Sequence, residues 1–155
     1  MSDSTFLTED GAEALRRELD TLINVKRPEL ARKLSEAVSQ GDLKENADYH
    51  DAKEQQAFIE GRIKYLETVL RTAKIVSNNG ASDVVSIGST VTIVEEGYDE
   101  EETYVIVGAA EAKPDEGKIS NKSPIGAALL GRRAGEIVRA YTPGGEIRLR
   151  IKAIQ

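Results

Sequence analysis

The chain has 155 residues, of which 39% are apolar, 31% charged and 5% aromatic, and its formal net charge is −6. This length allows one domain or two small ones, and the negative charge argues against binding of polyanions by bulk attraction, so any nucleic-acid contact must use a local basic face. Cysteine is absent and His50 is the one histidine, which excludes disulfides, thiol catalysis and thiolate zinc sites and argues against a self-contained zinc or Ser-His-Asp site.

The first predicted element is a long amphipathic helix from Thr8 to about Gln40. Thr8 followed by two acids is typical of a helix N-cap, because the positive end of the helix dipole favours acids in the first turn. Apolar residues then recur every three or four positions. Pro28 lacks a backbone donor and predicts a kink near Val25–Pro28, and Gly41 predicts the end of the helix.

The second predicted helix starts at Asp42 and carries a heptad pattern. Neither helix can bury its apolar stripe alone, so the two should pack as an antiparallel coiled-coil hairpin. Each arm has about 33 residues and should project roughly 50 Å. The seam of the second arm is formed by Tyr49, Ala52, Gln56, Ile59, Ile63, Leu66, Leu70 and Ala73.

The pattern changes after Val76, where residues 77–83 have the composition of a linker. From 84 to 155 the apolar period falls to about two, which predicts strands. These include Val91 and Ile93, Tyr104 and Ile106, Ile137 to Tyr141, and Ile147 to Ile151, with an acidic loop at Glu95–Glu102, a short helix at Pro124–Leu130 and a turn at Thr142 to Gly145.

The sequence therefore predicts an α+β protein. Residues 1–76 should form an antiparallel coiled-coil domain with an acidic tip at 41–51, followed by a linker at 77–83. Residues 84–155 should form a small antiparallel β-sheet packed on one short helix.

The tip carries acids at every third position, namely Asp42, Glu45, Asp48 and Asp51, which should lie along one edge of a helix. A charged point on a long hairpin indicates that the tip reaches into another molecule. Asp42 and Glu45 also fit a capping box, with Asp42 as the N-cap and Glu45 at the third helical position. The two interpretations are compatible, because a capping carboxylate can keep one oxygen free.

A resemblance to the bacterial GreA/GreB transcript-cleavage factors covers nearly the whole chain. It is carried most specifically by Gly41-Asp42-Leu43-Lys44-Glu45-Asn46-Ala47-Asp48-Tyr49-His50, continued by Lys53-Glu54-Gln55-Gln56 and Glu60-Gly61-Arg62-Ile63. Further matches are Arg27-Pro28-Glu29, Ser123-Pro124-Ile125-Gly126, Ala128-Leu129-Leu130-Gly131 and Thr142-Pro143-Gly144-Gly145-Glu146. The implied C-terminal fold is similar to that of the FK506-binding proteins.

The resemblance implies an accessory factor without an activity of its own. It would dock on bacterial RNA polymerase through the C-terminal domain, with Ser123 and Pro124 as candidate contacts, and pass the coiled coil down the secondary channel. There it would stimulate the polymerase to cleave its own transcript near the extruded 3′ end. Asp42 and Glu45 match the two functional acids of the family, and Asp48 falls where the family also carries an acid.

Carboxylate chemistry supports this role for the tip. Mg²⁺ takes octahedral oxygen coordination and commonly uses one or two carboxylates with waters and phosphate oxygens, so two tip carboxylates can complete a site begun by another protein. Asp42 would hold a Mg²⁺ ion shared with the polymerase and Glu45 would hold or orient its water, while the free protein would not bind the ion stably. Lys44 and Tyr49 are candidate contacts to the displaced nucleotide.

Some basic side chains of the coil are candidate contacts to the nascent RNA 3′ end: Arg16, Arg27 and Lys53. The plainer interpretation is that these residues form the solvated faces of a coiled coil, just as Ser123-Pro124 is by itself only a helix-start signal. A monomer is expected, and no apolar run reaches the ~20 residues of a membrane span. No secretory signal is recognisable, so a cytoplasmic location is expected.

Three other functions are open at this stage. A related channel-binding inhibitor would share the fold, but such proteins depart from this tip sequence. A prolyl isomerase would need an aromatic pocket, whereas residues 84–155 contain Tyr98, Tyr104 and Tyr141 and no other aromatic residue. A plain coiled-coil scaffold would explain the two arms but not the acidic tip.

Overall fold

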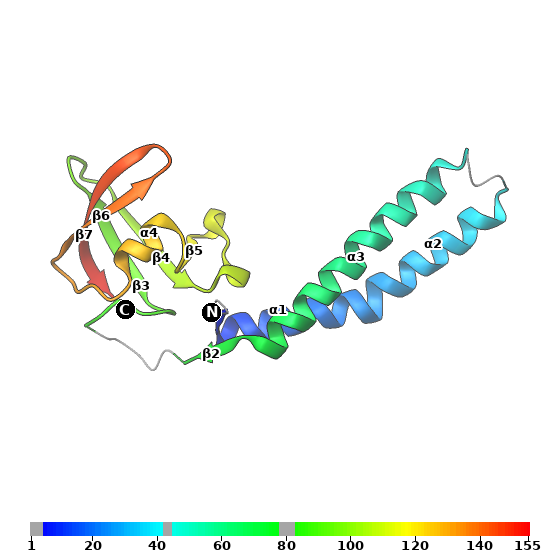
Figure 1. Cartoon of the computed structure of the whole chain (residues 1–155), viewed down its shortest axis with the longest axis horizontal. Coiled ribbons are helices and arrows are strands. Elements are labelled where there is room, and N and C mark those ends of the chain that lie inside the picture. The colour runs from blue at the N-terminus through cyan, green and yellow to red at the C-terminus, as the bar shows by residue number, and fades with distance from the viewer. Residues whose placement is uncertain (1–4, 42–44, 78–82) are drawn as a thin grey trace. The chain divides into compact units, whose positions relative to one another are not determined.

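The computed structural model describes residues 5–41, 45–77 and 83–155 (Figure 1). Contacts divide the chain into two compact units: one is Ala12–Thr72, and the other combines Met1–Gly11 with Ala73–Gln155. This division differs from the predicted boundaries, because the start of the chain groups with the C-terminal sheet. The α+β class itself is confirmed.

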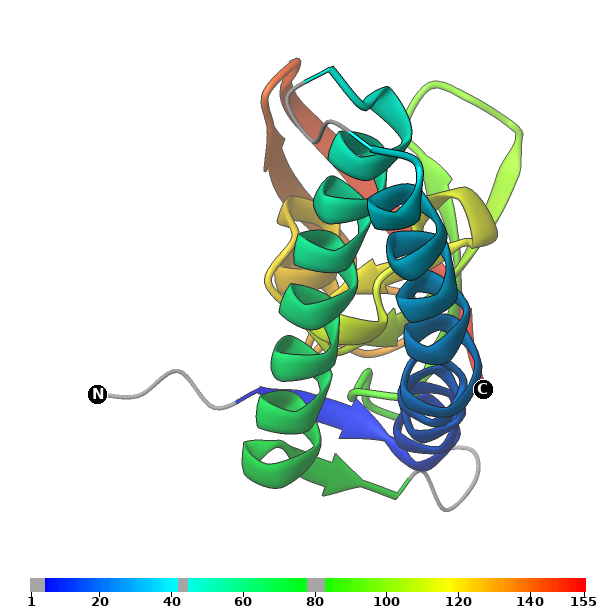
Figure 2. The ribbon, with the colours of Figure 1, turned by 90° about the vertical axis from the view of Figure 1, so that its right-hand side faces the viewer.

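The helical unit is a hairpin whose two arms lie side by side in both views (Figure 1, Figure 2). The first arm contains α1 (Glu9–Thr21), a π-helical turn η1 (Leu22–Lys26) and α2 (Arg27–Ser39), and the second arm is α3 (Ala47–Thr72). The predicted helical hairpin is confirmed. None of the helices in the described ranges is long and apolar enough to cross a membrane.

The interruption of the first arm has a local cause. In η1 the Arg27 N–H donates to the Leu22 carbonyl five residues earlier, which is the π-helical pattern. Pro28, in the first turn of α2, has no N–H, and its ring would collide with the carbonyl of residue 24 in a regular helix. The structure confirms an interruption beside the proline, in the form of one widened turn directly before α2.

The second arm buries three of its eight predicted seam residues, and the other five are half-buried. Ala52, Ile63 and Leu66 are buried, as is Val69, which the heptad pattern missed. The helix starts at Ala47 and not at Asp42, so the arm is 26 residues long and shorter than predicted.

Two bidentate ion pairs join the arms. Arg27 donates from Nε and Nη2 to the Glu60 carboxylate at 2.8 Å each, and Arg62 donates to Glu18 at 2.6 and 3.0 Å. The hydrogen bonds from Arg27 hold the pKa of Glu60 below its ordinary value. Such paired N–H···O bonds fix geometry as well as charge, so they set the register of the arms.

The C-terminal sheet has five strands in the order β5-β4-β3-β7-β6. They are β3 (Thr90–Glu95), β4 (Glu101–Val107), β5 (Lys118–Ser120), β6 (Ile137–Thr142) and β7 (Gly145–Ile154), with α4 (Pro124–Leu129) packed beside them. The core includes Val91, Ile93, Ile106, Leu129 and Ile151. The predicted strands, acidic loop, short helix and Thr142–Gly145 turn are confirmed.

One predicted feature of this sheet is wrong, because β5 runs parallel to β4 and the sheet is mixed. Parallel neighbours need a crossover instead of a tight hairpin. Here the chain crosses through two 3-10 turns, η2 (Ala109–Glu111) and η3 (Pro114–Glu116). The strand pattern gave no signal for this path, since the turns carry no apolar period.

The start of the chain forms a second, small sheet that was not predicted. Strand β1 (Phe6–Thr8) pairs in parallel with β2 (Lys74–Val76), directly after α3. Glu111 accepts hydrogen bonds from the Thr8 N–H at 2.7 Å and from the Thr8 hydroxyl at 2.6 Å. The same hydroxyl accepts from the Gly11 N–H at 3.0 Å, which confirms Thr8 as the N-cap of α1.

The hydrogen bond of Tyr104 on β4 can be tested by titrating its hydroxyl. Its hydroxyl donates to Glu102 at 2.6 Å, and this bond to a carboxylate raises the pKa of Tyr104 to about 12. The raised pKa stabilises the folded chain below pH 10.0, and this contribution is lost as the pH rises towards about 12. We expect one tyrosinate absorbance step near pH 12, which Glu102→Gln moves back towards pH 10.0. An unmoved step would show that Glu102 is not its cause.

Candidate functional site

The tip joins the end of α2 to the start of α3. Gly41 ends the first arm in the left-handed region, at φ 117°, where a glycine is favoured. Two residues assigned to the site, Asp42 and Lys44, lie outside the described residues. Glu45 and Asp48 are exposed, and Tyr49 is half-buried.

Asn46, which the sequence analysis did not single out, organises the described part of the tip. Its Oδ1 accepts from the Tyr49 N–H at 3.1 Å, so Asn46 is the N-cap of α3. Its Nδ2 donates to the Ala37 carbonyl at 2.6 Å, near the end of α2. The sequence signal was present, since asparagine is a strong N-cap and Asp48 supplies an acid in the first turn.

The capping-box interpretation of Asp42 and Glu45 is therefore wrong for α3. Glu45 precedes the cap instead of occupying the third helical position, and its side chain is exposed. Within the described ranges, the Glu45 carboxylate makes no hydrogen bond or ion pair. None of the described residues therefore occupies this carboxylate.

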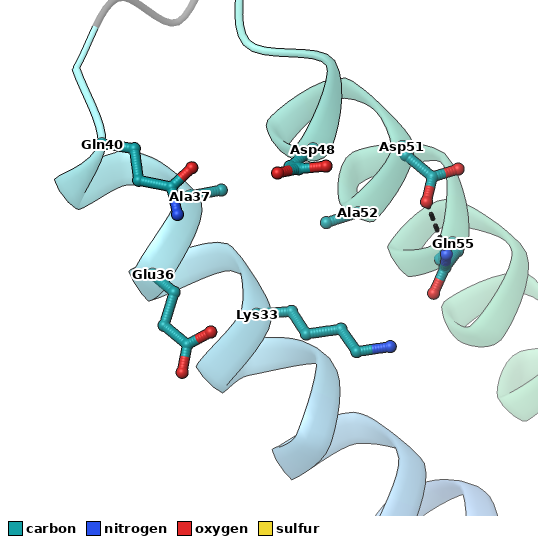
Figure 3. Close-up of a pocket in the computed structure, with 8 residues that line it drawn as sticks. All are labelled: Lys33, Glu36, Ala37, Gln40, Asp48, Asp51, Ala52 and Gln55. Carbon is teal, nitrogen blue, oxygen red and sulfur yellow. Dashed lines mark hydrogen bonds between the residues drawn. The ribbon is translucent and has the colours of Figure 1, made fainter.

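The other tip acids belong to a groove between α2 and α3 (Figure 3). The groove has a volume of about 300 Å³. Asp48 faces α2 across it, and Asp51 accepts a hydrogen bond from Gln55 at 2.9 Å. The lining is completed by Lys33, Glu36, Ala37, Gln40 and Ala52.

The acids do not form one cluster in the described part of the tip. Asp48 and Asp51 line the groove, whereas Glu45 precedes the helix. Among residues 5–41, 45–77 and 83–155, no group of three or more acids and histidines could hold a metal ion. A metal ligand from Glu45 would therefore need donors beyond these residues.

Two side chains of α3, His50 and Lys53, lie beside the Tyr49 ring. Its ring packs edge-on against His50, with centroids 5.6 Å apart, and the Lys53 ammonium lies 5.9 Å from the ring centre. Lys53 also donates to Gln56 at 3.3 Å. The structure thus brings together Tyr49 and Lys53, which the sequence analysis had assigned to nucleotide and RNA contacts.

The remaining assigned residues lie on the first arm of the hairpin and at the start of α4. Arg16 is exposed on α1, whereas Arg27 is held by Glu60. Ser123 is the N-cap of α4: its hydroxyl accepts from the Gly126 N–H at 3.1 Å and donates to the Ser120 carbonyl at 2.6 Å. The predicted helix start is confirmed, and the docking role of Ser123 and of the exposed Pro124 stays a prediction.

Asn46 makes two contacts that substitutions can separate. We expect Asn46→Ala to lower the free energy of unfolding of the hairpin by about 2 kcal/mol, because both the cap and the bond to Ala37 are lost. Asn46→Asp keeps the capping oxygen but loses the donor, so it should cost about half as much. Thermal unfolding followed by circular dichroism measures both values. Equal losses for the two variants would show that the cap contributes nothing.

Comparison with known proteins gives matches over the whole chain. The family model of the N-terminal domain of transcription elongation factors matches residues 5–75, and the C-terminal GreA/GreB model matches residues 80–155. The chain is 50% identical to transcription elongation factor GreA of Bacillus subtilis, over 96% of this chain and 94% of the relative. It is 48% identical to GreA of Thermoanaerobacter pseudethanolicus, over 100% and 99%.

Two solved structures are also similar to the chain. GreA factor homolog 1 of Thermus thermophilus is 32% identical, with a TM-score of 0.46 and coverage of 99% of both chains. A prokaryotic GreA/GreB factor from Nitrosomonas europaea is 27% identical, with a TM-score of 0.43 and coverage of 98% of this chain and 99% of that one.

Proposed function

The chain belongs to the GreA/GreB family of transcription elongation factors, and from this premise we propose that it stimulates transcript cleavage by bacterial RNA polymerase. The hairpin enters the secondary channel of the polymerase, and its tip acts on the extruded RNA 3′ end of a backtracked complex. The observation that carries this proposal is the exposed Glu45 carboxylate, which stands before the N-cap of α3 with no partner among the described residues.

The tip residues fit a shared Mg²⁺ site better than a site of their own. Carboxylate oxygens are the ligands that Mg²⁺ prefers, but the two carboxylates of Asp42 and Glu45 cannot fill six positions. When bound, Mg²⁺ lowers the pKa of a water and neutralises charge during in-line phosphoryl displacement. Asp42 would hold the ion together with donors from the polymerase, and Glu45 would accept a hydrogen bond from the attacking water and so orient it.

Other residues position this pair. Asn46 fixes the start of α3 to α2, so the chain carrying Glu45 is anchored on a rigid helix end. Tyr49 and Lys53 present a ring and an ammonium on the same turn, which suits a base and a phosphate of the displaced RNA. Lys44 adds a further positive charge at the tip.

The candidate contact residues away from the tip differ in whether their side chains already bind another residue. Arg16 is exposed on α1 and can meet an RNA phosphate, whereas Arg27 would first have to leave Glu60. Pro124 is exposed beside the capped start of α4, so Ser123 and Pro124 offer a rigid docking point for the polymerase. The protein works as a monomer in the cytoplasm, where the polymerase is found.

The alternatives are less well supported. A channel-binding inhibitor needs no accessible acid at position 45. A prolyl isomerase needs an enclosed aromatic pocket, but Tyr98 and Tyr141 are 65% and 69% exposed, and Tyr104 is bonded to Glu102.

The proposal is tested with backtracked elongation complexes assembled from purified polymerase and end-labelled RNA. We expect the protein to accelerate removal of the 3′ segment in the presence of Mg²⁺ and to leave the same RNA intact when polymerase is omitted. Cleavage of RNA without polymerase would make the protein a nuclease. Binding without acceleration would favour the inhibitor.

A further inference from the structure

Phe58 is an exposed apolar residue in the middle of α3. Its side chain is 76% exposed, the highest value among the large apolar residues of the described ranges. It lies off the seam that packs the two arms, and the neighbouring exposed positions of α3 are mostly charged or polar. One exposed apolar residue is ordinary on a protein surface, so its neighbours decide whether it has a role.

Gly61 lies one turn further along the same face, and no contact among the described residues explains it. Its φ is not positive, and a Cβ built on it meets none of their atoms within 4 Å. Alanine would therefore fit and would favour the helix more than glycine does. Neither the backbone conformation nor the packing requires a glycine here. Because Gly61 has no side chain, it leaves space on the helix surface beside Phe58, where the backbone of another protein can approach closely.

This face is held rigidly. Residues 60 and 62, on either side of Gly61, are both tied to the first arm by the bidentate pairs with Arg27 and Glu18. The Arg62 guanidinium also lies 5.4 Å from the centre of the Tyr65 ring, one turn beyond. Gly61 is therefore not a hinge, and the surface needs little ordering on binding.

We propose that Phe58 and Gly61 form a lateral contact with RNA polymerase, in which an apolar part of the channel wall covers Phe58 and its backbone lies against Gly61. The proposal rests on the proposed function, which places the tip of this hairpin in the channel. Phe58 follows Asn46 by twelve residues along α3, or roughly 18 Å, so a partner that encloses the hairpin from its tip to that depth reaches Phe58.

Charge and area argue against the other occupants. Glu54 is exposed one turn before Phe58, and a carboxylate there repels RNA phosphates. A stable dimer needs about 800 Å² from each partner, whereas a phenylalanine offers roughly 200 Å². The patch therefore suits an addition to a larger protein interface and not an interface between two copies.

Two substitutions test the contact, with Val25→Ala as the control because Val25 is 46% exposed on the other arm. We expect Phe58→Ala to weaken binding to core polymerase roughly tenfold, or about 1.4 kcal/mol, without changing Tm. Gly61→Ala should raise Tm by roughly 3 °C, because alanine favours the helix. It should still weaken binding, because the added methyl group occupies the space that the partner's backbone would take. Val25→Ala should bind as the wild type does.

A photoreactive phenylalanine analogue at position 58 identifies the partner directly. We expect it to label a polymerase subunit in the complex. Labelling of RNA alone or of a second copy, or wild-type affinity for both variants, would overturn the proposal. If the wild type stimulates cleavage while both variants bind normally, the lateral contact alone fails. If the wild type neither binds nor stimulates cleavage, the proposed function fails first.

Discussion

Asp42→Asn and Glu45→Gln should each lower the rate of stimulated transcript cleavage roughly 100-fold while leaving polymerase affinity close to that of the wild type. Each substitution keeps the size of the side chain but removes the charge and one strong acceptor. A ligand to Mg²⁺ and an orienting group for water both depend on that charge. Single-turnover cleavage and a separate binding assay measure the two effects independently.

Asp51→Asn is the matched control for these variants. It removes one carboxylate from the same hairpin, but Asp51 lies within α3 and is bonded to Gln55. Its cleavage rate should stay near that of the wild type. Wild-type rates for both Asp42→Asn and Glu45→Gln, or a loss of cleavage fully explained by lost binding, would contradict the assigned roles.

Gly108→Ala should destabilise the C-terminal unit by about 3 kcal/mol. Gly108 is buried, and a Cβ there would lie 1.5 Å from the backbone oxygen of Phe6. A backbone atom cannot turn aside as the end of a side chain can, so β1 would have to leave its place. The φ of Gly108 is −73°, which alanine adopts freely, so the clash alone accounts for the loss.

Denaturant unfolding gives the free energy, and amide exchange of β1 and β2 shows where the loss occurs. Protection of the β1 and β2 amides should fall in Gly108→Ala while α3 keeps its protection. Gly61→Ala is the control with the opposite expected sign, because no described atom lies within 4 Å of a Cβ at Gly61. An unchanged stability of Gly108→Ala would show that β1 does not pack against this residue in solution.

The features that the sequence predicted correctly are those with local signals. Apolar periods of three to four and of two marked the arms and strands, and Thr8 and Ser123 marked helix starts with their own side chains. Pro28 marked the interruption of the first arm through its missing donor, although the sequence could not say that a π-helical turn would absorb it.

The features that were missed depend on contacts between distant residues. The pairing of β1 with β2 joins segments separated by the whole hairpin, and Glu111 bonds to Thr8 across an even longer separation. The start of α3 shows the same limit. Both Asp42 and Asn46 are suitable caps, and the bond from Asn46 to Ala37 on the other arm favours the second.

At the site, the sequence predicted candidate residues, whose roles stay predictions, and it did not predict how the described ones are arranged. The acids recur every third position, but a helix start at Ala47 separates Glu45 from Asp48 and Asp51. Residues at every third position share one edge of a helix only where the chain is helical. The role of Asn46 as an anchor for Glu45 therefore required the structure.

The measurement that tests the central claim most directly is the Mg²⁺ dependence of stimulated cleavage. The Mg²⁺ concentration that gives half-maximal rate should be far higher for Asp42→Asn than for the wild type, and excess Mg²⁺ should partly restore the rate. This follows because a lost ligand weakens binding of the shared ion. An unchanged half-maximal concentration with a uniformly lower rate would contradict the account, since the tip would then not supply a metal ligand.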